Sequence, residues 1–171
     1  MRGLFLLAMV LAGQASAHPH SQTDQQVALT LTGQGTDVIV TIAPSPTDGP
    51  EVLRLIDTDG NGAISDAEAE DFGRSVIASA RWHADGLELP VTFDAIRMAD
   101  AQQIEAGLAP VVITASADQP GNARVVEFSM YYDVLSTTWF IQPWIATTAA
   151  APRIDRTENG ATLTLTFSEN G

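Results

Sequence analysis

The clearest chemical pattern in this chain lies at residues 57–68, which read Asp-Thr-Asp-Gly-Asn-Gly-Ala-Ile-Ser-Asp-Ala-Glu. Asp57, Asp59 and Asn61 alternate along the segment, and Glu68 adds a carboxylate at its end. Calcium is a hard cation that takes about six to eight oxygen ligands, so a chain must wrap carboxylates and carbonyls around one point to hold it. The residue types and their spacing therefore predict a calcium site.

Segment 57–68 resembles the calcium loop of the EF-hand superfamily at every diagnostic position. The resemblance implies that Gly62 allows the sharp turn and that Ala63 offers its backbone carbonyl. It also implies that Ser65 binds directly or through water and that Glu68 closes the shell with both oxygens. The expected calcium ligands are Asp57, Asp59, Asn61, Ala63, Ser65 and Glu68. A solvated polar turn is the alternative interpretation.

Two helices must position this loop, and the resemblance covers about residues 51–81. A short helix is predicted at residues 51–56, because Pro50 suits a first helical turn. A second helix is predicted from residue 65 to about residue 81, where apolar residues recur every four positions. Those apolar residues are Phe72, Val76 and Ala80.

Ile64 occupies the loop position that in EF-hands pairs with a second loop through a short β-bridge. No second loop exists here, since segment 94–105 has Ile96 and Met98 where ligands belong. Ile64 must therefore pair within its own domain, pair across a dimer, or stay unpaired. A lone exported site is expected to bind calcium with a dissociation constant on the order of 10⁻⁴ to 10⁻³ M, which suits a structural role better than sensing.

The chain has three histidines, two of which, His18 and His20, lie near its start. If the chain is cleaved before His18, as a secretory signal would require, His18 carries a free α-amine beside its imidazole. This pair could chelate copper, nickel or zinc, with His20 or the distant His83 as a further ligand. Pro19 disfavours a site built on backbone amides, because it has no N–H. The alternatives are a solvated arm and, for His83, a packing or helix-capping role.

A weaker resemblance rests on the order of short motifs: His-Pro-His at residues 18–20, a strand, the calcium-like loop, a helix, and strands with Tyr-Tyr-Asp at residues 131–133. This order is similar to that of small periplasmic proteins of unknown function and of extracytoplasmic domains found with nickel and cobalt transporters. The resemblance implies at most an accessory role, with a membrane transporter or another periplasmic protein as partner. A periplasmic protein that binds copper, nickel or zinc is thus the alternative function.

The first residues are typical of a secretory signal. Arg2 precedes a short apolar run at residues 4–12, and Ala-Ser-Ala at residues 15–17 matches a cleavage site. The run is well short of the roughly 20 residues that span a bilayer. We expect a signal peptide at residues 1–17 and a single mature domain at residues 18–171, periplasmic or secreted and without membrane insertion.

Composition narrows the function classes. With no cysteine, the chain has no disulfide, thiolate metal site or cysteine nucleophile. It has 8 basic and 21 acidic residues and a net charge of −13, so nucleic acid and anionic lipid are disfavoured as partners and divalent cations are attracted. No local motif combines a nucleophile with a base, and we expect neither enzymatic activity nor catalytic residues.

Apolar alternation and turn residues predict an α+β fold, mainly an antiparallel β-sandwich or barrel with the helix–loop–helix inserted. For residues 95–107 the sequence is compatible with a loop and with a short helix. Asn159-Gly160 predicts a tight primed hairpin turn. The seven expected strands lie at residues 27–32, 37–43, 87–93, 111–115, 124–133, 139–145 and 161–168.

Aromatic residues cluster near the end of the chain, where Trp139, Phe140 and Trp144 flank Pro143. We expect them in a strand of the sandwich core, with Pro143 at an edge or a bulge. A partner-binding patch is the alternative interpretation.

Overall fold

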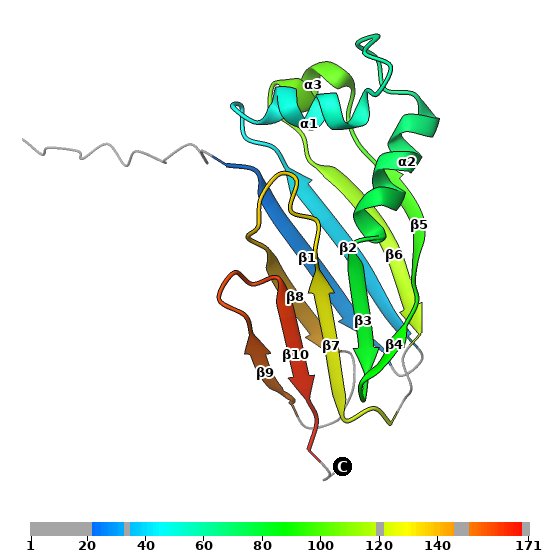
Figure 1. Ribbon diagram of the computed structural model, residues 1–171, viewed down its shortest axis with the longest axis vertical. Coiled ribbons are helices and arrows are strands. Elements are labelled where there is room, and N and C mark those ends of the chain that lie inside the picture. The colour runs from blue at the N-terminus through cyan, green and yellow to red at the C-terminus, as the bar shows by residue number, and fades with distance from the viewer. Residues whose placement is uncertain (1–21, 33–34, 119–121, 146–150, 169–171) are drawn as a thin grey trace, which may run out of the picture.

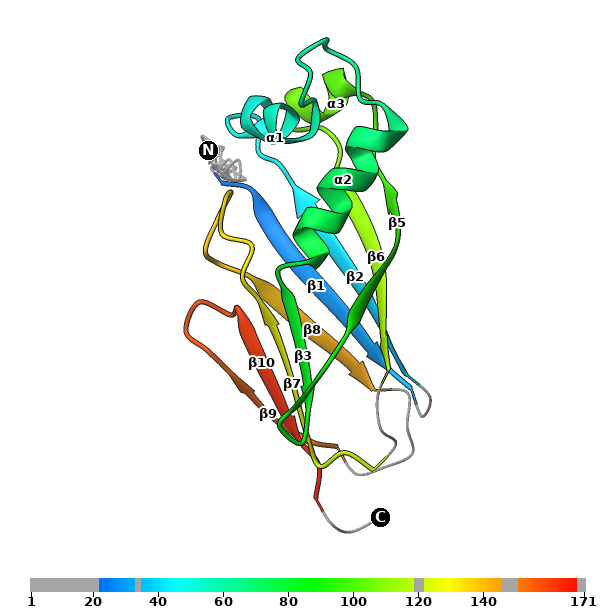
Figure 2. The ribbon, with the colours of Figure 1, turned by 45° about the vertical axis from the view of Figure 1, so that its right-hand side comes forward.

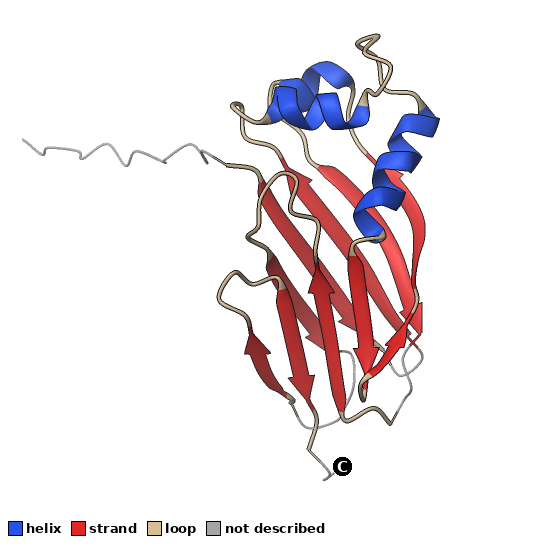
Figure 3. Cartoon of the chain, in the orientation of Figure 1, coloured by secondary structure: helices blue, strands red, loops and turns tan. Residues whose placement is uncertain are grey.

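The computed structural model describes residues 22–32, 35–118, 122–145 and 151–168. Its strands form two sheets that pack against each other, with the helices gathered at one end (Figures 1 and 3). The strands are β1 Asp24–Leu31, β2 Gly35–Ala43, β3 Ala80–Ala84, β4 Leu87–Leu89, β5 Val91–Arg97, β6 Val111–Asp118, β7 Val125–Met130, β8 Phe140–Ile145, β9 Arg153–Arg156 and β10 Thr162–Thr166. The helices are α1 Gly49–Ile56, α2 Asp66–Ile77 and α3 Ala101–Glu105.

The first sheet has the strand order β5-β6-β2-β1-β8, and the second has the order β4-β3-β7-β10-β9. Alternate residues of most strands point into the space between the sheets, where they form one apolar core, whereas β9 and most of β4 are exposed. Leu29 and Val40 contribute from the first sheet, and Trp82, Phe128 and Leu163 contribute from the second. The β-rich α+β class is confirmed, and of its two predicted forms the sandwich is the one observed.

One strand pairing differs from the predicted antiparallel arrangement. β1 pairs with β8 in parallel, whereas its pairing with β2 is antiparallel. A parallel neighbour needs a long connection between the two strands, and here residues 32–139 lie between β1 and β8.

The second helix ends earlier than predicted, at Ile77 instead of about residue 81. Ala80 starts β3, in which buried and exposed residues alternate. Trp82, two residues further along this strand, is fully buried and donates its indole N–H to the carbonyl of Asp118 at 3.1 Å. The four-residue spacing of Val76 and Ala80 fits a continuous helix, but it also fits a helix that ends before a strand starting at Ala80. Pairing of Ala80 with β7 favours the strand. His83 therefore lies in the middle of a strand and does not cap a helix.

Two other segments depart from the predicted pattern. The expected strand at residues 87–93 is divided at Pro90 into β4 and β5, which belong to different sheets. Residues 95–107, for which the sequence allowed a loop or a short helix, contain the end of β5 and the short helix α3. At the start of α3 the side chain of Asp100 accepts a hydrogen bond from the backbone N–H of Gln103 at 2.9 Å.

The hairpin of β9 and β10 has a wider turn than Asn159-Gly160 predicted. The backbone N–H of Thr157 bonds to the carbonyl of Thr162, so four residues form the loop. Gly160 has a φ of 68°, whereas Asn159 is not among the residues with positive φ, and a primed type I turn would need positive φ at both. Asn159 is used elsewhere, since its side-chain amide donates to the carbonyl of Thr137 at 3.2 Å.

The aromatic prediction near residue 140 is partly wrong. Trp139 is buried, but Phe140 and Trp144 are 57% and 61% exposed. Ile141 and Pro143 take the inward positions of β8, so the aromatic residues on either side of them point outward. β8 is an edge strand, which confirms the edge position of Pro143.

No helix within the described ranges is long and apolar enough to cross a membrane. The expected signal at residues 1–17 lies outside these ranges, and so do His18 and His20. The signal peptide and the single mature domain therefore stay predictions.

Candidate metal centre

Helix α1 leads into segment 57–68 from one side. Pro50 stands in its first turn, and the inward residues Val52 and Ile56 are fully buried. The start of α1 lies against α3, so closely that a Cβ on Gly49 would collide with the Glu105 carbonyl oxygen. The first end of the loop is thereby held on the body of the protein.

Helix α2 leaves the loop on the other side and lies along β5 (Figure 2). Phe72 and Val76 are buried, as their spacing predicted. A Cβ on Gly73 would meet the Phe93 ring at 2.6 Å, and the Arg74 guanidinium lies 4.8 Å from the centre of the same ring. Both ends of the loop therefore start from helices packed against the sandwich.

The loop turns through glycines at positive φ. Gly60 has a φ of 70° and Gly62 a φ of 81°, which confirms the sharp turn predicted at Gly62. The turn directs backbone N–H groups at Asp57, whose Oδ1 accepts from Asn61 at 3.2 Å and whose Oδ2 accepts from Gly62 at 2.9 Å. Only 9% of Asp57 is exposed, so its carboxylate points into the loop.

Glu68 joins the two ends of the loop with one carboxylate. Its Oε1 accepts from the backbone N–H of Thr58 at 2.9 Å and of Asp59 at 3.3 Å. Its Oε2 accepts from the backbone N–H of Ser65 at 3.0 Å and from the Ser65 hydroxyl at 2.7 Å. The Ser65 Oγ in turn accepts from the Glu68 N–H at 3.3 Å, which completes a capping box at the start of α2.

These hydrogen bonds keep Glu68 ionised. The backbone and hydroxyl of Ser65, followed by the backbone of Asp59, lower the pKa of Glu68 to about 2, because donors stabilise the charged carboxylate. Partial desolvation opposes the shift and is outweighed. At neutral pH the loop therefore carries a fully charged Glu68 without any metal.

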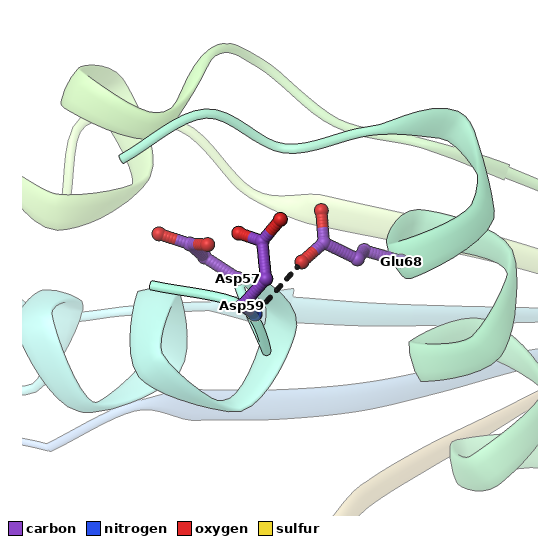
Figure 4. A group of neighbouring side chains, drawn as sticks. All are labelled: Asp57, Asp59 and Glu68. Carbon is purple, nitrogen blue, oxygen red and sulfur yellow. Dashed lines mark hydrogen bonds between the residues drawn. The ribbon is translucent and has the colours of Figure 1, made fainter. Parts of the chain in front are cut away.

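Three carboxylates converge in this loop. Asp57, Asp59 and Glu68 each direct an oxygen into one small space, and these oxygens lie within 4.8 Å of one another (Figure 4). Within the described ranges none of the three forms an ion pair with an arginine, and the arginines of the two flanking helices pair elsewhere, Arg54 with Glu51 and Arg74 with Glu70. Three like charges this close, without a cationic side chain, fit a bound cation.

The remaining predicted ligands lie in the same loop with different contacts. The Asn61 Oδ1 accepts from the Ala63 N–H at 2.8 Å, and its amide donates to Asp59 Oδ2 at 2.7 Å. The carbonyl of Ala63 receives no backbone hydrogen bond from the described residues outside helices and strands. The Ser65 hydroxyl is engaged with Glu68, so a water is the more suitable link from Ser65 to an ion.

Ile64 packs against its own domain. Its partly buried side chain contacts the apolar core, and the groove beside it is lined by Ile96 and Met98 at the end of β5. Of the strand pairings between described residues, none includes Ile64. Of the three alternatives for its backbone, pairing with a strand of the same domain is thus not observed.

Sequence reasoning missed the structural role of Thr58 and the capping box. The pattern Ser-x-x-Glu at residues 65–68 is a helix-start signal that could have revealed the box. Thr58 had no such signal, because its contact depends on how the loop folds back. Comparisons with protein-family models, curated proteins and solved structures found no match.

Proposed function

We propose that this protein is an exported calcium-binding protein in which one EF-hand-like loop, residues 57–68, holds the ion. The observation that carries the proposal is the convergence of Asp57, Asp59 and Glu68 without a cationic partner. The ion would be held by these three carboxylates, with oxygens of Asn61 and Ala63 and a water on Ser65.

Calcium suits these donors better than a transition metal does. Every side-chain donor in the loop is a carboxylate, amide or hydroxyl oxygen, and hard oxygen sets favour calcium or magnesium over zinc, copper or nickel. Magnesium demands near-ideal octahedral geometry and keeps most of its waters. A loop that can supply both oxygens of Glu68 favours the larger ion.

The role of the ion would be structural. Asp57 follows α1 directly and Glu68 lies in the first turn of α2, so one ion would join the two helices. Both helices already pack on the sandwich, and α2 presents no exposed apolar face, since its buried residues Phe72 and Val76 contact the core. Calcium would thus stabilise an existing arrangement and would not open a new surface.

A nuclear magnetic resonance titration tests this proposal. Calcium added to the metal-free full chain should shift the backbone amides of Asn61 and Gly62, because both donate to the Asp57 carboxylate. We expect one saturable process with a dissociation constant on the order of 10⁻⁴ to 10⁻³ M. Glu68→Gln should abolish saturation, whereas magnesium should produce weaker binding than calcium.

Glu70→Gln is the matched control. Glu70 lies on the same helix, is exposed and pairs with Arg74 instead of facing the loop. It should titrate like the unmodified chain. If the Glu68 and Glu70 variants behave alike, the amide shifts report general screening of an acidic protein, and the site does not exist as proposed.

A further inference from the structure

One row of polar residues crosses all five strands of the second sheet, which lies in front in Figure 1. The strand register places His83 of β3 opposite Glu88 of β4 on one side and opposite Glu127 of β7 on the other. The row continues through Thr164 of β10 to Asp155 of β9. Directly opposite residues share a face, with Cβ atoms about 4.5–5.5 Å apart, so the imidazole stands between two glutamates.

The ring of His83 has no partner among the residues that the structure describes. Its Nδ1 is buried and receives no hydrogen bond, and no hydrogen bond or ion pair to the ring occurs within the described part of the chain. The neighbours Trp82 and Ala84 are buried, so the backbone that carries the ring is fixed. A turn of the ring about χ2 would therefore break no hydrogen bond.

The two glutamates are weakly held by their present contacts. Glu88 lies 3.4 Å from the guanidinium of Arg81, and the two side chains are 60% and 44% exposed, so this ion pair contributes little. The Glu127 Oε2 accepts from the Thr164 hydroxyl at a long 3.4 Å. Both carboxylates are therefore free to turn toward a cation above His83.

Charge and donor type determine which cation fits. The row carries three carboxylates, on Glu88, Glu127 and Asp155, in a chain of net charge −13; Glu88 pairs with Arg81 and Asp155 with Arg153, and Glu127 is paired with no arginine of the described residues. A cation is attracted to such a surface. An imidazole between carboxylates favours zinc, copper or nickel, whereas calcium prefers oxygen alone.

We propose that His83, Glu88 and Glu127 form a second metal site that binds a divalent transition-metal ion of the zinc class. Zinc commonly takes three protein ligands and a water in a tetrahedral arrangement, and this row supplies one nitrogen and two oxygens. The site is independent of the loop at residues 57–68.

The test uses the full chain with His18→Ala and His20→Ala, which leaves His83 as the single histidine of three. Zinc is titrated in the presence of excess calcium, and the imidazole nitrogen resonances of His83 are followed directly. We expect a saturable shift of these resonances. Glu88→Gln and Glu127→Gln should each raise the zinc dissociation constant by at least about tenfold.

Two controls define the result. Glu105→Gln changes an exposed glutamate on α3 and should leave zinc binding unchanged. Glu68→Gln should also leave it unchanged, which separates this site from the proposed calcium site. The proposal is overturned if zinc does not move the His83 resonances, if both glutamate variants bind as tightly as their parent, or if Glu68→Gln removes zinc binding. Melting curves of each variant verify that it is folded.

Discussion

Calcium should raise the melting temperature of this protein, and Glu68→Gln should remove that rise. The reason is the arrangement of the loop ends: Asp57 is positioned by α1 and Glu68 by α2, and the carboxylates converge only when both helices are packed. An unfolded chain does not hold these groups together and should bind calcium much more weakly. Calcium therefore stabilises the native state by mass action.

The size of the effect follows from one site and its expected affinity. With a dissociation constant on the order of 10⁻⁴ to 10⁻³ M, calcium at about 10 mM should add about 1.4 to 2.7 kcal/mol to the free energy of unfolding. For a domain of this length each kcal/mol raises the melting temperature by about 2–4 °C, so the rise should be about 3–11 °C.

Circular dichroism melting curves measure this shift, with calcium compared against chelator at matched ionic strength. The matched ionic strength matters because salt also screens the repulsion within a chain of net charge −13. Glu70→Gln should show the same rise as the unmodified chain. Equal melting temperatures with calcium and with chelator, or an unchanged rise in Glu68→Gln, would refute the reasoning.

Two further predictions concern the loop without metal. Gly62→Ala should lower the free energy of unfolding by about 1–2 kcal/mol, because a φ of 81° strains any residue with a side chain, although no atom lies within 4 Å of the added Cβ. Gly86 has the same φ and equal space, so Gly86→Ala should lower the free energy of unfolding, measured by urea titration, by as much. Only Gly62→Ala should alter calcium binding. Acid should destabilise the calcium-free protein partly through Glu68, whose pKa is lowered from 4.5 to about 2 on folding. The contribution of Glu68 to the free energy of unfolding is complete above pH 4.5 and is lost as pH falls toward 2. Melting temperatures measured across this pH range should therefore fall more steeply for the unmodified chain than for Glu68→Gln. Parallel curves would contradict the lowered pKa of Glu68.

Local chemistry was readable where neighbouring residues decide the conformation. Gly62 was predicted to turn the loop and has positive φ, and apolar alternation predicted a strand at residues 37–43, where Val38, Val40 and Ile42 are buried in β2. Phe72 and Val76 were expected on the packed face of one helix and are buried there. Each of these predictions depends on contacts within a few residues, which spacing determines directly.

Predictions failed where a distant strand decided between two local patterns. Ala80 fits a helix and a strand equally, and only pairing with Met130 of β7 selects the strand. Phe140 and Trp144 were expected in the core, but Ile141 and Pro143, which lie between them, occupy the inward positions of β8. Asn159-Gly160 favours a two-residue turn by itself, and contacts of this loop with residues 137–139 accompany a wider one.

By itself, the sequence determined the segment of the candidate calcium loop and the β-rich class, because the spacing of carboxylates, glycine and alternating apolar residues is a local property. Tertiary structure decided the positions of both helices against the sandwich, the exposure of the edge aromatics, and the placement of His83 opposite Glu88 and Glu127. His83 and Glu127 are far apart in the chain, and the residues between them carry no signal of which strands pair. Hydrogen bonding between strands brings them together, and the shared apolar core selects that pairing.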